Sequence, residues 1–236
     1  MLAATGTAQA GWVLIEADGS EALISKGRMR GSWDIGTSIF DANSSKIVII
    51  DDMRRTYASG TVDELCAQIK SSVESMMGDM PAEQKEMVQQ MMGHENAPEV
   101  EIVDKGAGER ISGFATKCYD VLANGELYEQ LWIADDGELV AECQPVMMML
   151  ARFSQCMASA NPMAGASDPE ATPEYAGIFE LGVIVRSVGA GELEEGIAPE
   201  ETTIEKRDVP DSTFKVPDGY RAVSFADVLG LTYEDD

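Results

Sequence analysis

Few side chains in this sequence are of the kinds that enzymes use for catalysis. Its one histidine, His94, lies in the polar segment GHENAP, which predicts a solvated loop residue. The sequence has no nucleophile elbow, phosphate-binding loop, dinucleotide fingerprint, or HExxH or CxxC metal-binding spacing. With 42 acidic residues, some carboxylate pairs would look catalytic by chance. We therefore predict a protein that is not an enzyme, with no catalytic residue, no metal and no cofactor.

Methionine is the residue type whose distribution is unusual. Eleven of the 14 methionines fall within residues 76–92 or 147–163. The methionine side chain is unbranched and polarizable, so it packs around apolar partners of varied shape. The clusters therefore predict either ordinary core packing or a deformable lid over an apolar ligand, and copper(I) binding by thioethers is a third hypothesis. The residues expected to line such a cavity are Met76, Met80, Met87, Met91, Met148, Tyr128 and Trp132.

Both methionine clusters lie in segments with helical periodicity. Thr61 and Glu64 form a capping-box pattern, and apolar residues then recur every three or four positions. Pro81 is placed to open a second helix at its first position. We therefore expect helical insertions at about 61–93 and 146–159.

The rest of the pattern predicts antiparallel strands joined by short turns. Residues 12–59 are typical of a β-meander. The turn signals Asn124-Gly125 and Asp136-Gly137 predict a three-stranded meander over about 111–145. Further extended segments are predicted in IFELGVIVRSVG, TTIEKRDV and STFKVPDGY, with a short helix in SFADVLG.

The four cysteines could form disulfides or remain thiols. The predicted register places Cys118 and Cys143 on opposite faces of two strands that a third strand separates, too far apart to be bridged. Two pairings remain if all four cysteines are oxidised: Cys66–Cys118 with Cys143–Cys156, or Cys66–Cys143 with Cys118–Cys156. Either pairing would tie a helix to the sheet. Four buried thiols are the alternative.

Positive charge is scarce and partly concentrated in the segment KGRMRG. A strand there would place Lys26, Arg28 and Arg30 on one face. The simplest interpretation is a solvated face or pairing with nearby carboxylates. The alternative is that Arg28 or Arg30 lies at a cavity mouth and binds a polar headgroup.

The overall charge excludes some partners. Seventeen basic and 42 acidic residues give a net charge of −25, so nucleic acid and anionic lipid surfaces should be repelled. The acidity indicates a solvated shell or, alternatively, recruitment of a basic partner. No apolar run approaches the roughly 20 residues of a transmembrane helix. The first ten residues, MLAATGTAQA, are typical of the end of a signal peptide, although a disordered natural N-terminus is the alternative.

The order of these segments resembles the bacterial LolA-like superfamily, in particular exported members that are domains of unknown function. The matching positions are Gly113, Cys118, Tyr119, Trp132, Ile133, Ala134, Pro217, Gly219 and Tyr220. The resemblance implies an α+β fold for residues 11–236 as one domain. It also implies a strongly curved antiparallel sheet, an incomplete barrel, whose concave face is covered by the Met-rich helices. Characterised relatives carry lipoproteins or lipids between membranes.

Together these features predict an exported, periplasmic binding or carrier protein. It would hold an apolar small molecule, a lipid or an acyl chain, with a lipoprotein as a further option, in a hydrophobic cavity. The alternative is a protein–protein interaction module or a homodimer that uses the Met-rich surface and binds no small ligand.

Overall fold

The predicted meander is present and contains six strands. The computed structural model describes residues 10–16, 18–33, 36–79, 81, 98–160, 168–195 and 201–230. The strands of the meander are β1 (Ala10–Ile15), β2 (Glu21–Ser25), β3 (Arg28–Trp33), β4 (Gly36–Asp41), β5 (Lys46–Asp51) and β6 (Thr56–Thr61). Lys26 and Gly27 both have positive φ, 54° and 65°, and form a tight turn between β2 and β3. The segment KGRMRG, predicted as a strand, therefore begins with this turn, and its strand starts at Arg28.

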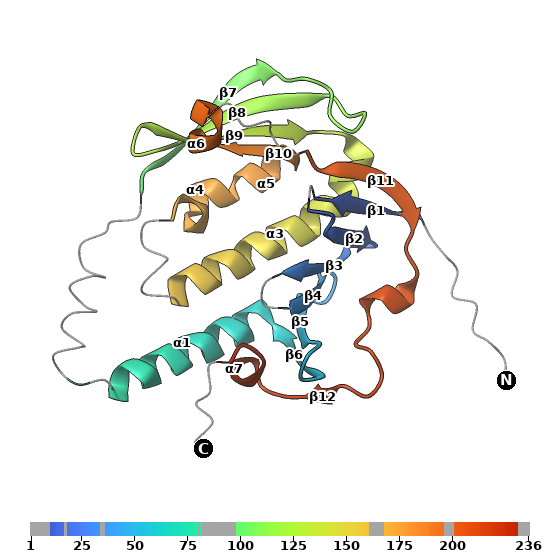
Figure 1. The fold of residues 1–236 in the computed structure, drawn as a ribbon, viewed down its shortest axis with the longest axis vertical. Coiled ribbons are helices and arrows are strands. Elements are labelled where there is room, and N and C mark those ends of the chain that lie inside the picture. Colours follow the sequence, from blue (N-terminus) through green and yellow to red (C-terminus); the bar gives the residue numbers. More distant parts are fainter. Residues whose placement is uncertain are drawn as a thin grey trace.

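Two segments from the end of the chain complete this sheet. β11 (Thr203–Asp208) pairs antiparallel with β1, and β12 (Arg221–Ala222) pairs parallel with β6. The eight strands follow the order β11-β1-β2-β3-β4-β5-β6-β12. The sheet therefore brings the chain's last third beside its first sixty residues (Figure 1).

A second sheet contains four antiparallel strands in the order β10-β9-β8-β7. Its strands are β7 (Val100–Ala107), β8 (Thr116–Ala123), β9 (Glu126–Ala134) and β10 (Val183–Gly189). Asn124 and Gly125 form the predicted tight turn, with φ values of 53° and 82°. A two-residue turn alone would pair Cys118 with Leu131, but a bulge between Val121 and Leu122 shifts the register, so Cys118 pairs with Trp132.

Helix α3 (Gly137–Ala160) is nine residues longer at its start than the predicted helix. The side chain of Asp136 accepts hydrogen bonds from the backbone N–H groups of Glu138 and Leu139, both at 3.1 Å. Asp136 therefore caps a helix. The predicted strand over 138–145, and the strand register derived for Cys143, are wrong.

The two long helices pack side by side against the large sheet. α1 (Val62–Asp79) and α3 run in the same direction, and α3 lies between α1 and the small sheet (Figure 1). Phe40 of the large sheet and Phe153 of α3 meet edge to face at 5.7 Å between ring centroids. The main core therefore joins both helices and both sheets, and it includes Ile24, Ile47, Leu65, Leu139 and Val185.

Short helices cover one face of the small sheet. These are a 3₁₀ turn (Pro169–Ala171), α4 (Pro173–Ala176) and α5 (Ile178–Leu181). Tyr175 and Ile178 pack on Tyr119, Val121 and Leu131 of the sheet. The first part of the predicted strand IFELGVIVRSVG is therefore helical.

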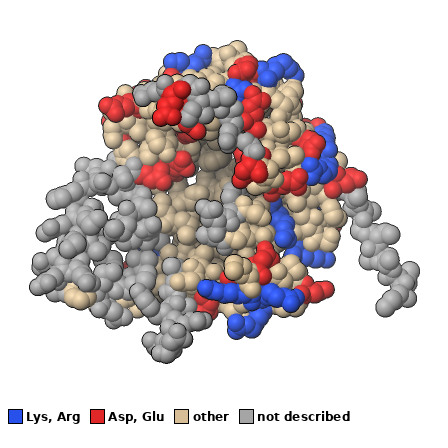
Figure 2. All heavy atoms as spheres, in the orientation of Figure 1, with Lys and Arg blue, Asp and Glu red and all other residues tan. Residues whose placement is uncertain are grey.

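The remaining segments agree in part with the prediction. α6 (Ala190–Glu195) follows β10, and a 3₁₀ turn (Asp211–Phe214) replaces the predicted strand STFKVPDGY. β11 confirms the segment TTIEKRDV, and α7 (Phe225–Val228) confirms the short helix of SFADVLG. Acidic side chains spread over the face shown in Figure 2, with fewer basic ones between them.

The α+β fold contains two separate sheets, neither of them closed or strongly curled. The predicted incomplete barrel with Met-rich helices over its concave face is therefore wrong. The prediction failed because the residues expected to form the next strand of the small sheet belong to α3. This helix packs between the two sheets. The predicted helix that opens at Pro81 lies outside the described residues.

Candidate functional site

A pocket of about 260 Å³ opens where α1 begins, beside the middle of α3 and the turn between β4 and β5. Three separate parts of the chain therefore form its walls. Its lining residues are Ala42, Ser45, Thr61, Val62, Asp63, Pro145, Met148, Met149 and Arg152.

Helix α3 supplies one continuous wall of this pocket. Pro145, Met148, Met149 and Arg152 are spaced i, i+3, i+4 and i+7, which places them along one helix face. Met149 is 7% exposed and also packs in the main core, whereas Met148 is half-buried. This wall therefore consists of apolar side chains followed by the guanidinium group of Arg152.

The start of α1 forms the opposite wall, and a capping box fixes it in place. The backbone N–H of Thr61 donates to the Glu64 carboxylate at 2.7 Å, and the N–H of Glu64 donates to the Thr61 hydroxyl at 3.1 Å. Val62 is buried beneath this turn. The predicted helix start at Thr61 is confirmed, and it places Thr61, Val62 and Asp63 at the pocket.

An ion pair joins the two walls at the solvent side of the pocket. The Arg152 guanidinium lies 2.8 Å from the Asp63 carboxylate, and the two side chains are 59% and 81% exposed. An exposed pair of this kind contributes little to stability. The pocket is therefore lined by apolar side chains, among them Val62, Met148 and Met149, together with this exposed charged pair.

A disulfide joins the same two helices one turn further along. Cys66 and Cys156 are bonded with their Cα atoms 5.6 Å apart, while Cys118 and Cys143 are free thiols. Both two-bridge pairings predicted from the sequence are therefore wrong. They assumed that Cys143 lies on a strand, but it is buried on α3, where burial raises its pKa to about 12. The bridge ties helix to helix and fixes the spacing of the pocket walls.

Three of the predicted cavity residues, Met148, Tyr128 and Trp132, have side chains that the structure describes. Met148 lines this pocket, whereas Tyr128 and Trp132 lie on β9 of the small sheet. Met76 is in α1, but its side chain is not among those described, and Met80, Met87 and Met91 lie outside the described residues. Arg152 and Asp63 were not predicted from the sequence. The spacing of Arg152 from the methionines of α3 is the signal that could have found it.

The headgroup candidates Arg28 and Arg30 hold the segment after β11. Arg28 donates to Asp211 at 2.5 Å and lies 4.4 Å from the ring centroid of Phe214, and Arg30 donates to the carbonyl of Thr213 at 3.1 Å. Because Met29 between them is fully buried, both arginines point to the other face of the sheet. They are therefore paired away from the pocket, as the simpler interpretation predicts.

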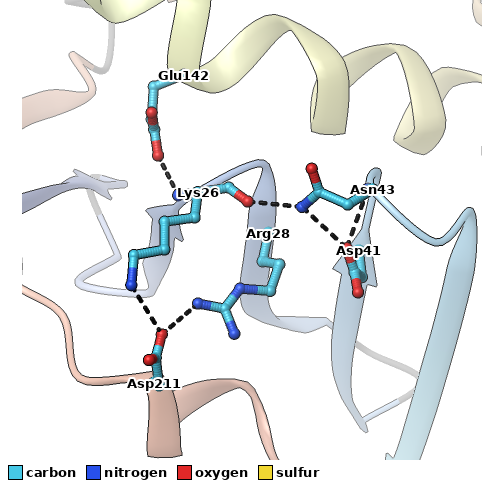
Figure 3. Close-up of polar contacts among 6 residues, drawn as sticks. All are labelled: Lys26, Arg28, Asp41, Asn43, Glu142 and Asp211. Carbon is cyan, nitrogen blue, oxygen red and sulfur yellow. Dashed lines mark hydrogen bonds and ion pairs between the residues drawn. The ribbon is translucent and has the colours of Figure 1, made fainter. Parts of the chain in front are cut away.

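The turn between β2 and β3 is also held by polar contacts (Figure 3). The Lys26 backbone N–H donates to Glu142 of α3, and the Lys26 carbonyl accepts from the Asn43 side chain at 2.7 Å. Its ammonium group lies 3.4 Å from Asp211. These contacts hold the hairpin against α3. The polar groups of Lys26 are used in them, so we do not assign Lys26 to a binding site.

A second polar cluster lies under the short helices of the small sheet. The Tyr128 hydroxyl donates to Glu170 at 3.1 Å, and the Ser187 hydroxyl donates to Glu129 at 2.5 Å. Burial raises the pKa of the Glu170 carboxyl, the charges of Asp168 and Glu129 add to the rise, and the Tyr128 hydrogen bond opposes it. Because these hydroxyl and carboxylate groups pair with one another, we assign the cluster a structural role.

Replacing Glu170 with glutamine is expected to raise the urea midpoint near pH 7 and to change little below about pH 4. With a raised folded-state pKa, the stability from Glu170 is complete below its unfolded-state pKa and is lost as pH rises through the folded-state pKa. Glutamine stays neutral and still accepts from Tyr128. The gain is small because Glu170 remains partly in solvent.

Urea unfolding of both proteins at the two pH values checks this prediction. Glu174→Gln, at an exposed position of α4, controls for the loss of one negative charge. If Glu170→Gln had a lower urea midpoint than the natural sequence near neutral pH, the raised pKa of Glu170 would be contradicted.

Within the described part of the chain, no cluster of three or more His, Cys, Asp or Glu side chains is arranged to hold a metal ion. None of the helices described there is both long and apolar enough to cross a membrane. Protein-family models and curated proteins give no match to this chain. The LolA-like resemblance therefore stays a prediction.

Proposed function

We propose that this chain is a non-enzymatic binding protein that holds an apolar group in the pocket between α1 and α3. The observation that carries the proposal is the position of Met148 and Met149, which lie together in one pocket with Val62, Ala42 and Pro145. Methionine adapts to ligands of different shape. This wall belongs to the second methionine cluster of the sequence, so the unusual composition and the cavity coincide.

The size of the pocket limits the ligand. Pockets for drug-sized molecules have volumes of roughly 300 to 1,000 Å³, and this pocket holds about 260 Å³. It therefore fits a short apolar chain, or one end of a longer chain, and not a whole lipid. Each buried methylene contributes about 0.8 kcal/mol. Affinity should therefore rise about fourfold for each added methylene until the pocket is full.

The chemistry of the lining supports binding more than catalysis. It offers the hydroxyls of Ser45 and Thr61 and the Asp63–Arg152 pair, and none of the lining residues that the structure describes is a histidine or a cysteine. A nucleophile without an adjacent base is weak. The Cys66–Cys156 bridge supports the further proposal of export, because disulfides persist mainly in oxidising compartments.

A series of neutral straight-chain alcohols, from butanol to decanol, tests the proposal by isothermal titration calorimetry. We expect affinity to rise with chain length and then level off. Met148→Glu should weaken binding of 1-octanol at least tenfold, because the new carboxylate would lose its hydration against the ligand. Met53→Glu is the matched control, since Met53 is 97% exposed on another turn.

Two results would contradict the proposal. One is an absence of binding for every alcohol in the series. The other is equal loss of binding in the Met148 and Met53 variants, which would place the ligand elsewhere or show only a general effect of charge. Native mass spectrometry of the purified protein, followed by solvent extraction, would then identify any molecule that remains bound.

A further inference from the structure

The rim of the pocket carries hydrogen-bond donors that the described hydrogen bonds leave available. Arg152 carries five N–H donors, and one described hydrogen bond, to Asp63, uses one of them. Ser45 and Thr61 add two hydroxyl groups at the same rim. The Thr61 oxygen already accepts from the Glu64 N–H, so its hydrogen is free to point to a ligand.

The backbone at this rim also carries partial positive charge, which favours a bound anion. Thr61, Val62 and Asp63 line the pocket at the first turn of α1, an 18-residue helix. The first N–H groups of a helix lack partners within the helix, and the helix dipole places partial positive charge there. Lys46 pairs with Thr61 across β5 and β6 and adds a cation nearby.

Asp63 lines the pocket, Asp41 and Glu64 are sequence neighbours of lining residues, and all three carboxylates are already engaged. Asp41 accepts from Asn43 and Ser44, and Glu64 accepts from the N–H of Thr61. Asp63 is held by Arg152 alone among the described contacts and is 81% exposed. Because an exposed pair is weak, a ligand anion can take the place of Asp63 on the guanidinium while Asp63 turns into solvent.

From these contacts we propose that the pocket selects amphipathic anions, such as a short fatty acid, and that Arg152 determines this selectivity. The inference rests on the proposed function, since the apolar chain must first occupy the interior against Met148 and Met149. The ligand carboxylate then lies at the rim and accepts hydrogen bonds from Arg152 and from the hydroxyls of Ser45 and Thr61. Charge-assisted hydrogen bonds of this kind are roughly twice as strong as neutral ones.

Three probes with the same chain length separate this inference from the proposed function. At about pH 7, octanoate is anionic, 1-octanol is neutral and octylammonium is cationic. We expect octanoate to bind about tenfold more tightly than 1-octanol, and octylammonium to bind more weakly than either. If 1-octanol binds and octanoate gains nothing, the inference fails and the proposed function stands. If no probe binds, the proposed function itself fails.

Two substitutions should act in opposite directions. Arg152→Gln removes the charge, so octanoate should lose its preference over 1-octanol. Asp63→Asn frees the guanidinium and should strengthen octanoate binding by about threefold or more. Both positions are exposed, so circular dichroism should show a folded protein in each case.

The sign of the Asp63→Asn effect decides between an anion site and a cation site. Weaker binding of octylammonium in Asp63→Asn, with no gain for octanoate, would overturn the proposal and identify Asp63 as the recognition group. Octanoate binding that Arg152→Gln leaves unchanged would also overturn it.

Discussion

Replacing Cys66 and Cys156 with serine is expected to lower the free energy of unfolding by about 4 kcal/mol. The two residues are 90 positions apart, so their bridge closes a long loop and removes much of the freedom of the unfolded chain. The structure adds a second reason, because the bridge lies where α1 and α3 pack together, with Cys156 only 6% exposed. Urea unfolding, with and without dithiothreitol, measures the effect.

The free cysteines provide the control for this prediction. Cys118→Ser should leave the urea midpoint of the oxidised protein nearly unchanged and should keep its full sensitivity to dithiothreitol, since Cys118 is a free thiol. The Cys66→Ser, Cys156→Ser double variant should show no such sensitivity. If reduction left the unfolding curve of the natural sequence unchanged, the bridge would contribute nothing to its stability.

Loss of the bridge should also weaken ligand binding at the pocket. Cys66 follows Asp63 by one turn of α1, and Cys156 follows Arg152 by one turn of α3. Without the bridge the two helices hold their spacing only through packing. A preorganised site binds more tightly than one that must be assembled, because less conformational freedom is lost on binding.

Local signals predicted local structure well in this chain. The Thr61–Glu64 capping box, the Asn124-Gly125 turn and the β-meander predicted for residues 12–59 each correspond to what the structure shows. Each of these depends on residues close together in sequence. Propensity and hydrogen bonding within a few residues are therefore enough to determine them.

The errors arose where one local signal serves two structures. Asp136-Gly137 is typical of a hairpin turn, but the aspartate is also a preferred helix cap, and the long apolar face of α3 decides in favour of the helix. The bulge at Val121 gives no clear signal in the sequence. It shifts the β9 partner of each β8 residue from Thr116 to Val121 by one position. The relative positions predicted for Cys118 and Cys143 depended on that register.

The candidate site could be predicted only in part, because its walls come from distant segments. The methionine cluster identified Met148. Asp63 and Arg152 are 89 residues apart and meet only because α1 packs beside α3. The same packing brings Cys66 to Cys156. No pattern within one helix predicts which other helix will lie beside it, so the charged rim and the disulfide had to come from the structure.

Replacing Arg186 with alanine is expected to lower the free energy of unfolding by about 2–3 kcal/mol. Arg186 is 5% exposed, pairs with Glu109 at 2.5 Å and with Glu201, and lies 4.9 Å from the ring centroid of Trp132. It links the small sheet to the residues that lead into β11, where Thr202 donates to the Val185 carbonyl at 3.2 Å. Both glutamates are more than half exposed and regain water when the arginine is lost, which keeps the cost moderate.

Two further substitutions at this position separate packing from charge. Arg186→Met keeps the contact with Trp132 and removes the need to bury a charge, so it should be the least destabilising. Arg186→Lys should be clearly destabilising, because one ammonium group cannot reach two separated carboxylates and also stack on the ring. Arg207 is the matched control. It also pairs with two glutamates, Glu21 and Glu205, but on the exposed face of β11.

Urea unfolding followed by tryptophan fluorescence would rank these variants. Arg207→Met should leave the midpoint nearly unchanged, since exposed ion pairs contribute little. A midpoint for Arg186→Lys equal to that of the natural sequence would contradict the argument, because it would show that charge alone, without the planar geometry of the guanidinium, holds the junction. The expected order of midpoints is instead the one that follows if the Arg186 guanidinium stabilises this junction by contacting Trp132 and both glutamates at once.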